Sequence, residues 1–245
     1  MNCIHKRKNY SFISICSLLI AMSLTGCVDL SGAKYHEVSK KVRHDAKSTA
    51  HGSAKKVAQI KKHEPYRGEV HTMLGGLGVF STGMKELSSS VVETYNIPAP
   101  SGMWYNAGGV SRSIIAYYYK HKNHRPIILV GHSLGANEQI KVARNLNKAG
   151  VPVDLLVTVD AVSQTVVPPN VKHAMNFYKP GYVPMFSGLK LRAVDPDKTR
   201  IDNINVATLK GVAVNHFTID KNPVVQAMIM KEVKKVTTNA NRAKA

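Results

Sequence analysis

Short apolar runs alternate with segments of helical periodicity from residue 68 towards the end of the chain. The runs that predict strands are residues 69–74, 127–130, 153–159 and 171–178. The segments whose apolar spacing predicts helices are residues 84–95, 110–121, 136–149 and 223–236. Strands that alternate with helices favour a mostly parallel sheet covered on both faces. The sequence therefore predicts a single small α/β domain over residues 67–245.

The sequence Gly131-His132-Ser133-Leu134-Gly135 joins the apolar run 127–130 to the helical segment 136–149. A G-x-S-x-G pattern between a strand and a helix is typical of a tight turn that presents a nucleophilic serine. The flanking glycines are needed because such a turn leaves no room for a Cβ atom, and the serine itself takes a strained backbone conformation. The start of the following helix favours negative charge at the same point. We therefore predict that Ser133 is a nucleophile.

The segment that runs from Pro126 through this turn to Val159 resembles α/β-hydrolases of the lipase and thioesterase type. The resemblance extends over residues 68–235 and is sharpest at the five-residue turn. It implies the α/β-hydrolase fold, and hydrolysis of an ester or thioester through a Ser-His-Asp triad. The sequence carries no metal-ligand cluster and no dinucleotide fingerprint, so we expect neither a metal nor another cofactor.

A serine nucleophile needs a base, and the chain has 11 histidines. His216 lies late in the sequence and before the final helical segment, where this family places its catalytic histidine. His71 and His173 are less suitable candidates, and His132 is expected to point away from Ser133. We therefore predict that His216 is the base.

The base needs a carboxylate that orients it. Asp160 ends the apolar run 153–159, and the carboxyl end of a parallel strand is the active-site edge of such a sheet. Its spacing of 27 residues from Ser133 resembles that of the thioesterase branch. Most α/β-hydrolases place the acid one strand later, which leaves Asp195 as the main alternative, with Asp197 and Asp202 behind it.

An oxyanion hole for this chemistry has two backbone N–H donors. One is the N–H of Leu134, directly after the nucleophile. The second is expected from the glycine-rich segment at residues 74–80, with Gly76 or Leu77 as the donor, because glycine lets the backbone approach a substrate closely. The glycines could instead cradle a phosphate, but no Lys-Ser/Thr pair follows them.

Residues 1–26 have the features of a secretory signal, with a basic cluster at residues 6–8 and an uncharged stretch at residues 10–24. As a helix this stretch spans about 22 Å, less than the roughly 30 Å hydrocarbon core of a bilayer. The sequence Leu24-Thr25-Gly26-Cys27 resembles the lipobox of bacterial lipoproteins. This resemblance implies cleavage before Cys27 and attachment of diacylglycerol and palmitate-type acyl chains to that residue.

Residues 27–66 follow as a basic tether, in a chain whose formal net charge is +19. The tether either adheres to anionic lipid headgroups or envelope polymers, or is only a soluble spacer. A basic chain could also bind nucleic acid, but no finger, helix-turn-helix or RNA-binding motif is present, so we expect no nucleic-acid partner. The lipobox implies a lipid anchor in the cell membrane or the outer membrane, with the domain in the periplasm or at the cell surface.

Taken together, these features predict a membrane-anchored serine hydrolase that cleaves an ester or thioester. A second hypothesis is a non-catalytic lipoprotein of the same fold that binds a lipid, an envelope component or a host partner. The candidate triad favours the enzyme, because a pure binding protein has no need of all three residues.

Overall fold

The computed structural model describes residues 68–76, 78–182 and 188–242. The expected signal at residues 1–26, Cys27, the basic tether at residues 27–66 and the oxyanion candidate Leu77 all lie outside the described residues. None of the described helices is long and apolar enough to cross a membrane.

A six-stranded sheet forms the centre of the fold, in the order β2-β1-β3-β4-β6-β8. Its strands are β1 (Glu69–Leu74), β2 (Ser101–Met103), β3 (Ile127–His132), β4 (Leu155–Val159), β6 (His173–Tyr178) and β8 (Arg200–Asn205). Every neighbouring pair in this sheet is parallel. A separate two-stranded sheet pairs β5 (Val166–Val167) with β7 (Arg192–Ala193). The carboxyl ends of all six main strands therefore meet at one edge.

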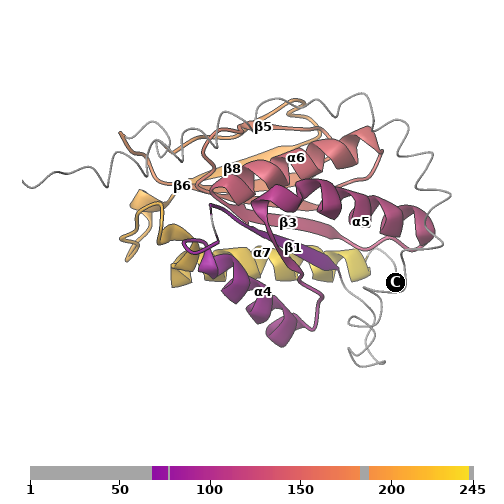
Figure 1. The fold of residues 1–245 in the computed structure, drawn as a ribbon, viewed down its shortest axis with the longest axis horizontal. Coiled ribbons are helices and arrows are strands. Elements are labelled where there is room, and N and C mark those ends of the chain that lie inside the picture. Colours follow the sequence, from indigo (N-terminus) through magenta and orange to yellow (C-terminus); the bar gives the residue numbers. More distant parts are fainter. Residues whose placement is uncertain (1–67, 77, 183–187, 243–245) are drawn as a thin grey trace, which may run out of the picture.

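Four long helices cover the two faces of the sheet, as Figure 1 shows. They are α4 (Thr82–Tyr95), α5 (Ala107–Lys120), α6 (Leu134–Lys148) and α7 (Pro223–Arg242). The helices α4 and α7 pack on one face, while α5 and α6 pack on the other. Short 3-10 turns complete the described chain: η1 (Trp104–Asn106), η3 (Val206–Thr208) and η4 (Ile219–Lys221).

The two sides of the core follow from the alternation of side chains along each strand. In β3, Ile128 and Val130 join the cluster under α4 and α7, whereas Ile127 and Leu129 join the cluster under α5 and α6. All six residues of β3 are buried, as expected for a central strand covered on both faces. The predicted fold class, a single small α/β domain with a mostly parallel sheet and helices on both faces, is confirmed.

The polar strand β8 was not predicted from the sequence. Its residues Arg-Ile-Asp-Asn-Ile-Asn contain no apolar run, and most of them are partly exposed. β8 lies at the edge of the sheet, where one side of the strand has no neighbour and polar side chains reach solvent. The three-residue β2, at the opposite edge, was missed because it is too short to show any periodicity.

Candidate active site

Ser133 lies between β3 and α6, at the carboxyl edge of the sheet. Its backbone has φ 57° and ψ −123°, a conformation that costs free energy for a residue with a side chain. The neighbouring glycines allow this turn, because a Cβ on Gly131 would lie 2.4 Å from the carbonyl oxygen of Gly135. A Cβ on Gly135 would lie 2.3 Å from the carbonyl oxygen of Met73 in β1. The turn thus packs against the start of α6 and against β1, with no space for side chains at either glycine.

The backbone N–H groups of Ser133 and of the residue after it have different roles at the junction between β3 and α6. The N–H of Ser133 donates to the carbonyl of Val159, the last residue of β4, at 2.9 Å. Leu134 begins α6, so its N–H has no acceptor within the helix and is available for a ligand. The first turn of α6 also stabilises negative charge beside the Ser133 hydroxyl.

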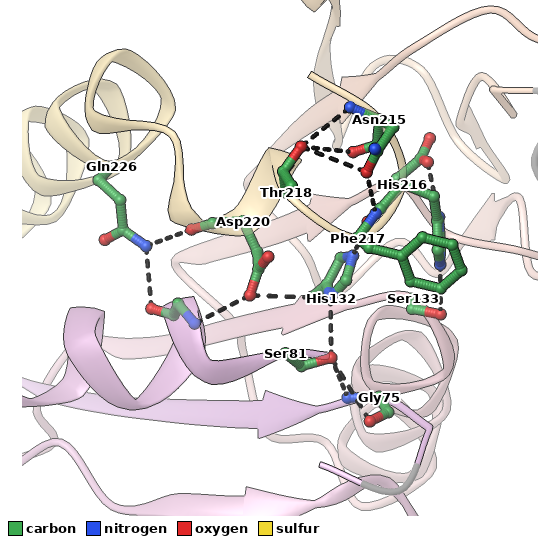
Figure 2. Close-up of polar contacts among 12 residues, drawn as sticks. Gly75, Ser81, His132, Ser133, Asn215, His216, Phe217, Thr218, Asp220 and Gln226 are labelled. Atoms are coloured by element: carbon green, nitrogen blue, oxygen red, sulfur yellow. Dashed lines mark hydrogen bonds and ion pairs between the residues drawn. The ribbon is translucent and has the colours of Figure 1, made fainter. Parts of the chain in front are cut away.

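The structure brings Ser133, His216 and Asp160 together, although they come from three separate parts of the chain. Nε2 of His216 lies 2.9 Å from Oγ of Ser133 (Figure 2). Nδ1 of His216 lies 2.7 Å from Oδ2 of Asp160. Each nitrogen of the imidazole therefore has one of the two predicted partners. This geometry allows the ring to accept a proton from the hydroxyl while the carboxylate stabilises the charge that results.

Asp160 is held by the ends of two neighbouring strands. It directly follows β4 with φ 47°, and its N–H donates to the carbonyl of Phe177 in β6 at 2.7 Å. The N–H of Lys179 approaches Oδ1 of Asp160 at 3.4 Å, and the Lys179 ammonium donates to the carbonyl of Val214 at 2.6 Å. The carboxylate is buried, with 2% of the residue exposed. Lys179 thus connects the acid to the segment that carries His216.

The segment around His216 is shaped by Asn215, which no sequence pattern had singled out. The carbonyl of Asn215 accepts from the N–H groups of Thr218 and Ile219, and its side-chain oxygen accepts from the N–H of Phe217. The hydroxyl of Thr218 in turn accepts a hydrogen bond from the N–H of Asn215 at 3.0 Å. These bonds close a compact turn and hold the imidazole against the end of the sheet (Figure 2).

The glycine-rich segment after β1 lies directly over the serine turn. A Cβ on Gly75 would lie 2.5 Å from the carbonyl oxygen of His132 and 2.8 Å from Cβ of Ser133. Gly76 has φ 53°, and its carbonyl accepts from the indole N–H of Trp104 at 2.6 Å. The structure therefore places Gly75 in direct contact with the serine turn, and the oxyanion candidate Gly76 is the next residue along the chain. The other candidate donor, Leu77, lies outside the described residues.

The alternative residues occupy other environments. Asp195 lies before β8, at the amino end of that strand, and pairs with Lys198 at 2.9 Å. His71 lies within β1 and contacts Glu69 at 3.1 Å. His173 begins β6 and contacts Asp202 at 2.8 Å and Glu232 at 3.2 Å. All of these contacts therefore lie away from the carboxyl ends of the strands, where Ser133 and Asp160 are found. Within the described ranges, no cluster of three or more His, Cys, Asp or Glu residues could hold a metal ion.

An exposed aromatic pair flanks the catalytic candidates. The rings of Phe80 and Phe217 lie 5.2 Å apart, and 54% of Phe80 and 42% of Phe217 are exposed. The Phe217 ring also meets the His216 ring edge-on at 5.3 Å. Val79, with 65% of its surface exposed, precedes Phe80. An apolar group bound beside Ser133 would cover these rings, and burial of apolar surface favours binding.

No family model matches this chain, and no curated protein matches its sequence. Among solved structures, the fold is similar to that of a protein assigned to the alpha/beta superfamily of hydrolases, from Xanthomonas campestris pv. campestris. That alignment covers 70% of this chain and 99% of the other, with 11% identity and a TM-score of 0.41. The type II thioesterase BorB from the borrelidin biosynthetic cluster aligns with 71% of this chain and 96% of its own, with 10% identity and a TM-score of 0.40. At these identities and TM-scores, no substrate or catalytic residue is transferred from either protein to this chain.

Proposed function

We propose that this protein is a serine hydrolase that cleaves an ester or thioester bond. The observation that carries the proposal is the continuous contact from Ser133 Oγ through the His216 imidazole to the Asp160 carboxylate, at 2.9 and 2.7 Å. These three groups lie at the carboxyl edge of a parallel sheet, where ligands of open α/β sheets bind.

In the proposed reaction, His216 Nε2 takes the proton from the Ser133 hydroxyl as Oγ attacks the carbonyl carbon. The Asp160 carboxylate holds the His216 tautomer and stabilises the imidazolium. The N–H groups of Leu134 and Gly76 stabilise the oxyanion of the tetrahedral intermediate. Collapse of this intermediate breaks the ester or thioester bond, and the alcohol or thiol leaves with the proton of His216. A water molecule, activated by His216, then releases the acid from Ser133.

The exposed Phe80–Phe217 pair favours a substrate that has an apolar group next to the scissile carbonyl. Attachment to a membrane through a lipidated Cys27 forms a second part of the proposal, supported by the sequence at residues 24–27. The anchor would hold the enzyme at a surface rich in acyl esters. Replacing Cys27 with alanine should then abolish incorporation of labelled palmitate and release the protein from the membrane fraction.

Comparison of the purified full chain with a Ser133→Ala variant tests the proposed reaction. Both proteins are assayed on p-nitrophenyl esters of short and medium chain length and on acyl thioesters. We expect the variant to lose at least ~10³-fold in kcat, as serine hydrolases do when the nucleophile is removed. A fluorophosphonate probe should label the wild-type protein at Ser133 and leave the variant unlabelled. Absence of both hydrolysis and labelling would favour the non-catalytic binding protein.

A further inference from the structure

We propose that His132 and Ser81 form a positioning pair that joins the oxyanion loop to the turn that carries the catalytic base. The oxyanion loop means the described residues 75–76 and 78–81, and the base turn means residues 215–220. The inference rests on the proposed hydrolase function, because it concerns how the oxyanion loop and the base turn of that site are held at fixed positions relative to each other. Figure 2 shows the bridge, with His132 between Ser81 and the backbone of His216.

On the side of the oxyanion loop, His132 contacts a hydroxyl that itself holds the loop. Oγ of Ser81 lies 2.8 Å from Nδ1 of His132. The same Oγ accepts from the N–H of Gly75 at 3.0 Å. Ser81 immediately precedes α4 and is 2% exposed, so its position is set by a helix and by packing. The Ser81 hydroxyl therefore connects the two ends of the loop that contains Gly76.

On the side of the base turn, His132 contacts the backbone of the catalytic candidate itself. Nε2 of His132 lies 2.8 Å from the carbonyl oxygen of His216. A carbonyl oxygen only accepts hydrogen bonds, so Nε2 of His132 carries a proton and donates it. The imidazole of His132 therefore fixes the main chain from which the His216 side chain extends.

A single neutral form of His132 satisfies both contacts. With the proton on Nε2, Nδ1 accepts the Ser81 hydroxyl hydrogen. That hydrogen could also reach the Gly75 carbonyl, but at 3.4 Å this oxygen is farther away than Nδ1. His132 is 1% exposed, and this burial lowers the pKa of His132 to about 3, so the ring stays neutral at physiological pH. The bridge is thus built from one fixed tautomer.

A second connection reinforces the bridge from the other end of the base turn. Oδ2 of Asp220 accepts from the N–H of Gly83, in the first turn of α4, at 2.9 Å and lies 3.9 Å from Nδ1 of His132. A Cβ on Gly83 would lie 2.3 Å from the Asp220 carbonyl oxygen, so the two segments are in direct contact. The Gln226 amide donates to the carbonyls of Gly83 and Asp220. The base turn and the start of α4 therefore form one frame around His132.

The bridge has a direct consequence for the proposed chemistry. As the Ser133 hydroxyl attacks, negative charge develops at the oxyanion while positive charge develops on His216. Both charges must be met by groups already in place, and a displacement of 1 Å can cost 10²-fold in rate. His132, one residue before the nucleophile, sets both groups from a common point. His132 is buried and does not touch the substrate, so its role is positioning.

The first test is the Ser81→Ala variant of the full chain, with Ser111→Ala as its matched control. Ser111 is another buried serine, in α5, whose hydroxyl donates to Ala107 and accepts from Asn145, away from the site. We expect Ser81→Ala to lower kcat by about 10- to 100-fold with KM changed by less than about 3-fold. Ser111→Ala should lower Tm by a similar amount while kcat stays unchanged. Equal effects of the two variants on kcat would reduce Ser81 to a structural role.

The second test removes the two hydrogen bonds of His132 one at a time, by replacing His132 with a residue that has an amide side chain. His132→Asn keeps a polar group near the position of Nδ1, so the contact with Ser81 is retained and that with His216 is lost. His132→Gln reaches the position of Nε2 and has the opposite effect. Each of these variants breaks the bridge at one end, so adding Ser81→Ala should cost at least about 3-fold less in both backgrounds than it costs in the wild-type protein. The full wild-type cost of Ser81→Ala in both backgrounds would overturn the proposal.

These outcomes are distinguishable from failure of the proposed function. If the wild-type protein neither hydrolyses the esters nor reacts with the fluorophosphonate probe at Ser133, the serine hydrolase proposal fails. If the wild-type protein is active and labelled while the variants behave as purely structural substitutions, only the positioning role of His132 and Ser81 fails.

Discussion

Oδ2 of Asp160 lies 2.7 Å from Nδ1 of His216, although 56 residues separate them in the sequence. The contact joins a residue at the end of β4 to a turn that comes after the last strand of the sheet. Because the carboxylate is almost fully buried, little solvent screens its interaction with the imidazole. The same relationship makes a direct prediction about the acid.

Replacing Asp160 with asparagine should leave the packing intact but allow the wrong tautomer of His216. We expect kcat to fall on the order of 10³- to 10⁴-fold with little change in KM, as Ser-His-Asp enzymes show when the acid is replaced. Asp195→Asn is the control, since that carboxylate contacts Lys198 at the other end of the strands and its loss should leave kcat unchanged. Steady-state kinetics on one ester measures both variants, and a larger loss from Asp195→Asn would reassign the acid.

Replacing Gly135 with alanine should disrupt the serine turn. The added Cβ would lie 2.3 Å from the Met73 carbonyl oxygen, so the turn and β1 must separate. We expect a loss of about 1–3 kcal/mol in the free energy of unfolding, together with a large loss of activity. Gly102→Ala is the matched control, because a Cβ there meets no atom within 4 Å. Urea unfolding of both variants measures the difference, and equal stability of the two would contradict the packing described here.

The buried carboxyl of Asp220 should make stability depend on pH. Burial raises the pKa of Asp220 from 3.8 to about 6, and Oδ1 has no hydrogen-bond partner among the described residues. A pKa that is raised in the folded state means that folding favours the protonated carboxyl. The contribution of Asp220 to the free energy of unfolding is therefore fully present below pH 3.8 and is lost as the pH rises through about 6.

Asp220→Asn, which stays neutral, removes this dependence. Relative to wild type, the variant should gain up to about 3 kcal/mol in free energy of unfolding between pH 4 and pH 8. Urea unfolding at pH 4, 5, 6, 7 and 8 measures the difference between the two proteins. A difference that is constant over this range, or that changes with the opposite sign, would show that Asp220 ionises normally in the folded protein.

The exposed aromatic pair should influence which acyl chains are cleaved. Phe217→Ala removes apolar surface beside His216, so we expect kcat/KM for a medium-chain ester to fall about 10-fold more than for an acetyl ester. Val194→Ala removes an exposed apolar side chain near Asp195, away from the site, and should leave the ratio unchanged. Rates on a series of p-nitrophenyl esters measure the ratio, and an unchanged chain-length profile in Phe217→Ala would exclude contact between these rings and the acyl chain.

The parts of the fold that could be predicted from the sequence are those with strong local patterns. The buried strand β3 begins with a continuous apolar run and is followed by a glycine-flanked serine, so its position and the turn after it could be inferred from the sequence. The polar edge strand β8 had no such pattern. A strand that is half solvated and rich in asparagine is recognisable only from its partner, β6, with which it pairs over six residues.

Some residues of the candidate site could likewise be predicted from the sequence, and others could not. Residues at the ends of apolar strands, such as Ser133 and Asp160, follow from the topology of a parallel sheet. The bridge between Ser81 and His132 does not, because 51 residues separate them and both are ordinary polar residues in sequence terms. His132 was expected to point away from Ser133, and nothing local indicated what it would contact. Contacts of this kind depend on how two loops meet, which only the assembled structure defines.

The order of the site residues along the chain also bears on folding. Ser133 and Asp160 follow the neighbouring central strands β3 and β4, whereas His216 comes only after the edge strand β8. A growing polypeptide therefore contains the nucleophile and the acid well before the residue that would activate the serine. Reactivity can arise only when the final strand has been added and the chain has turned back over the sheet, so acquisition of activity should be among the last events of folding.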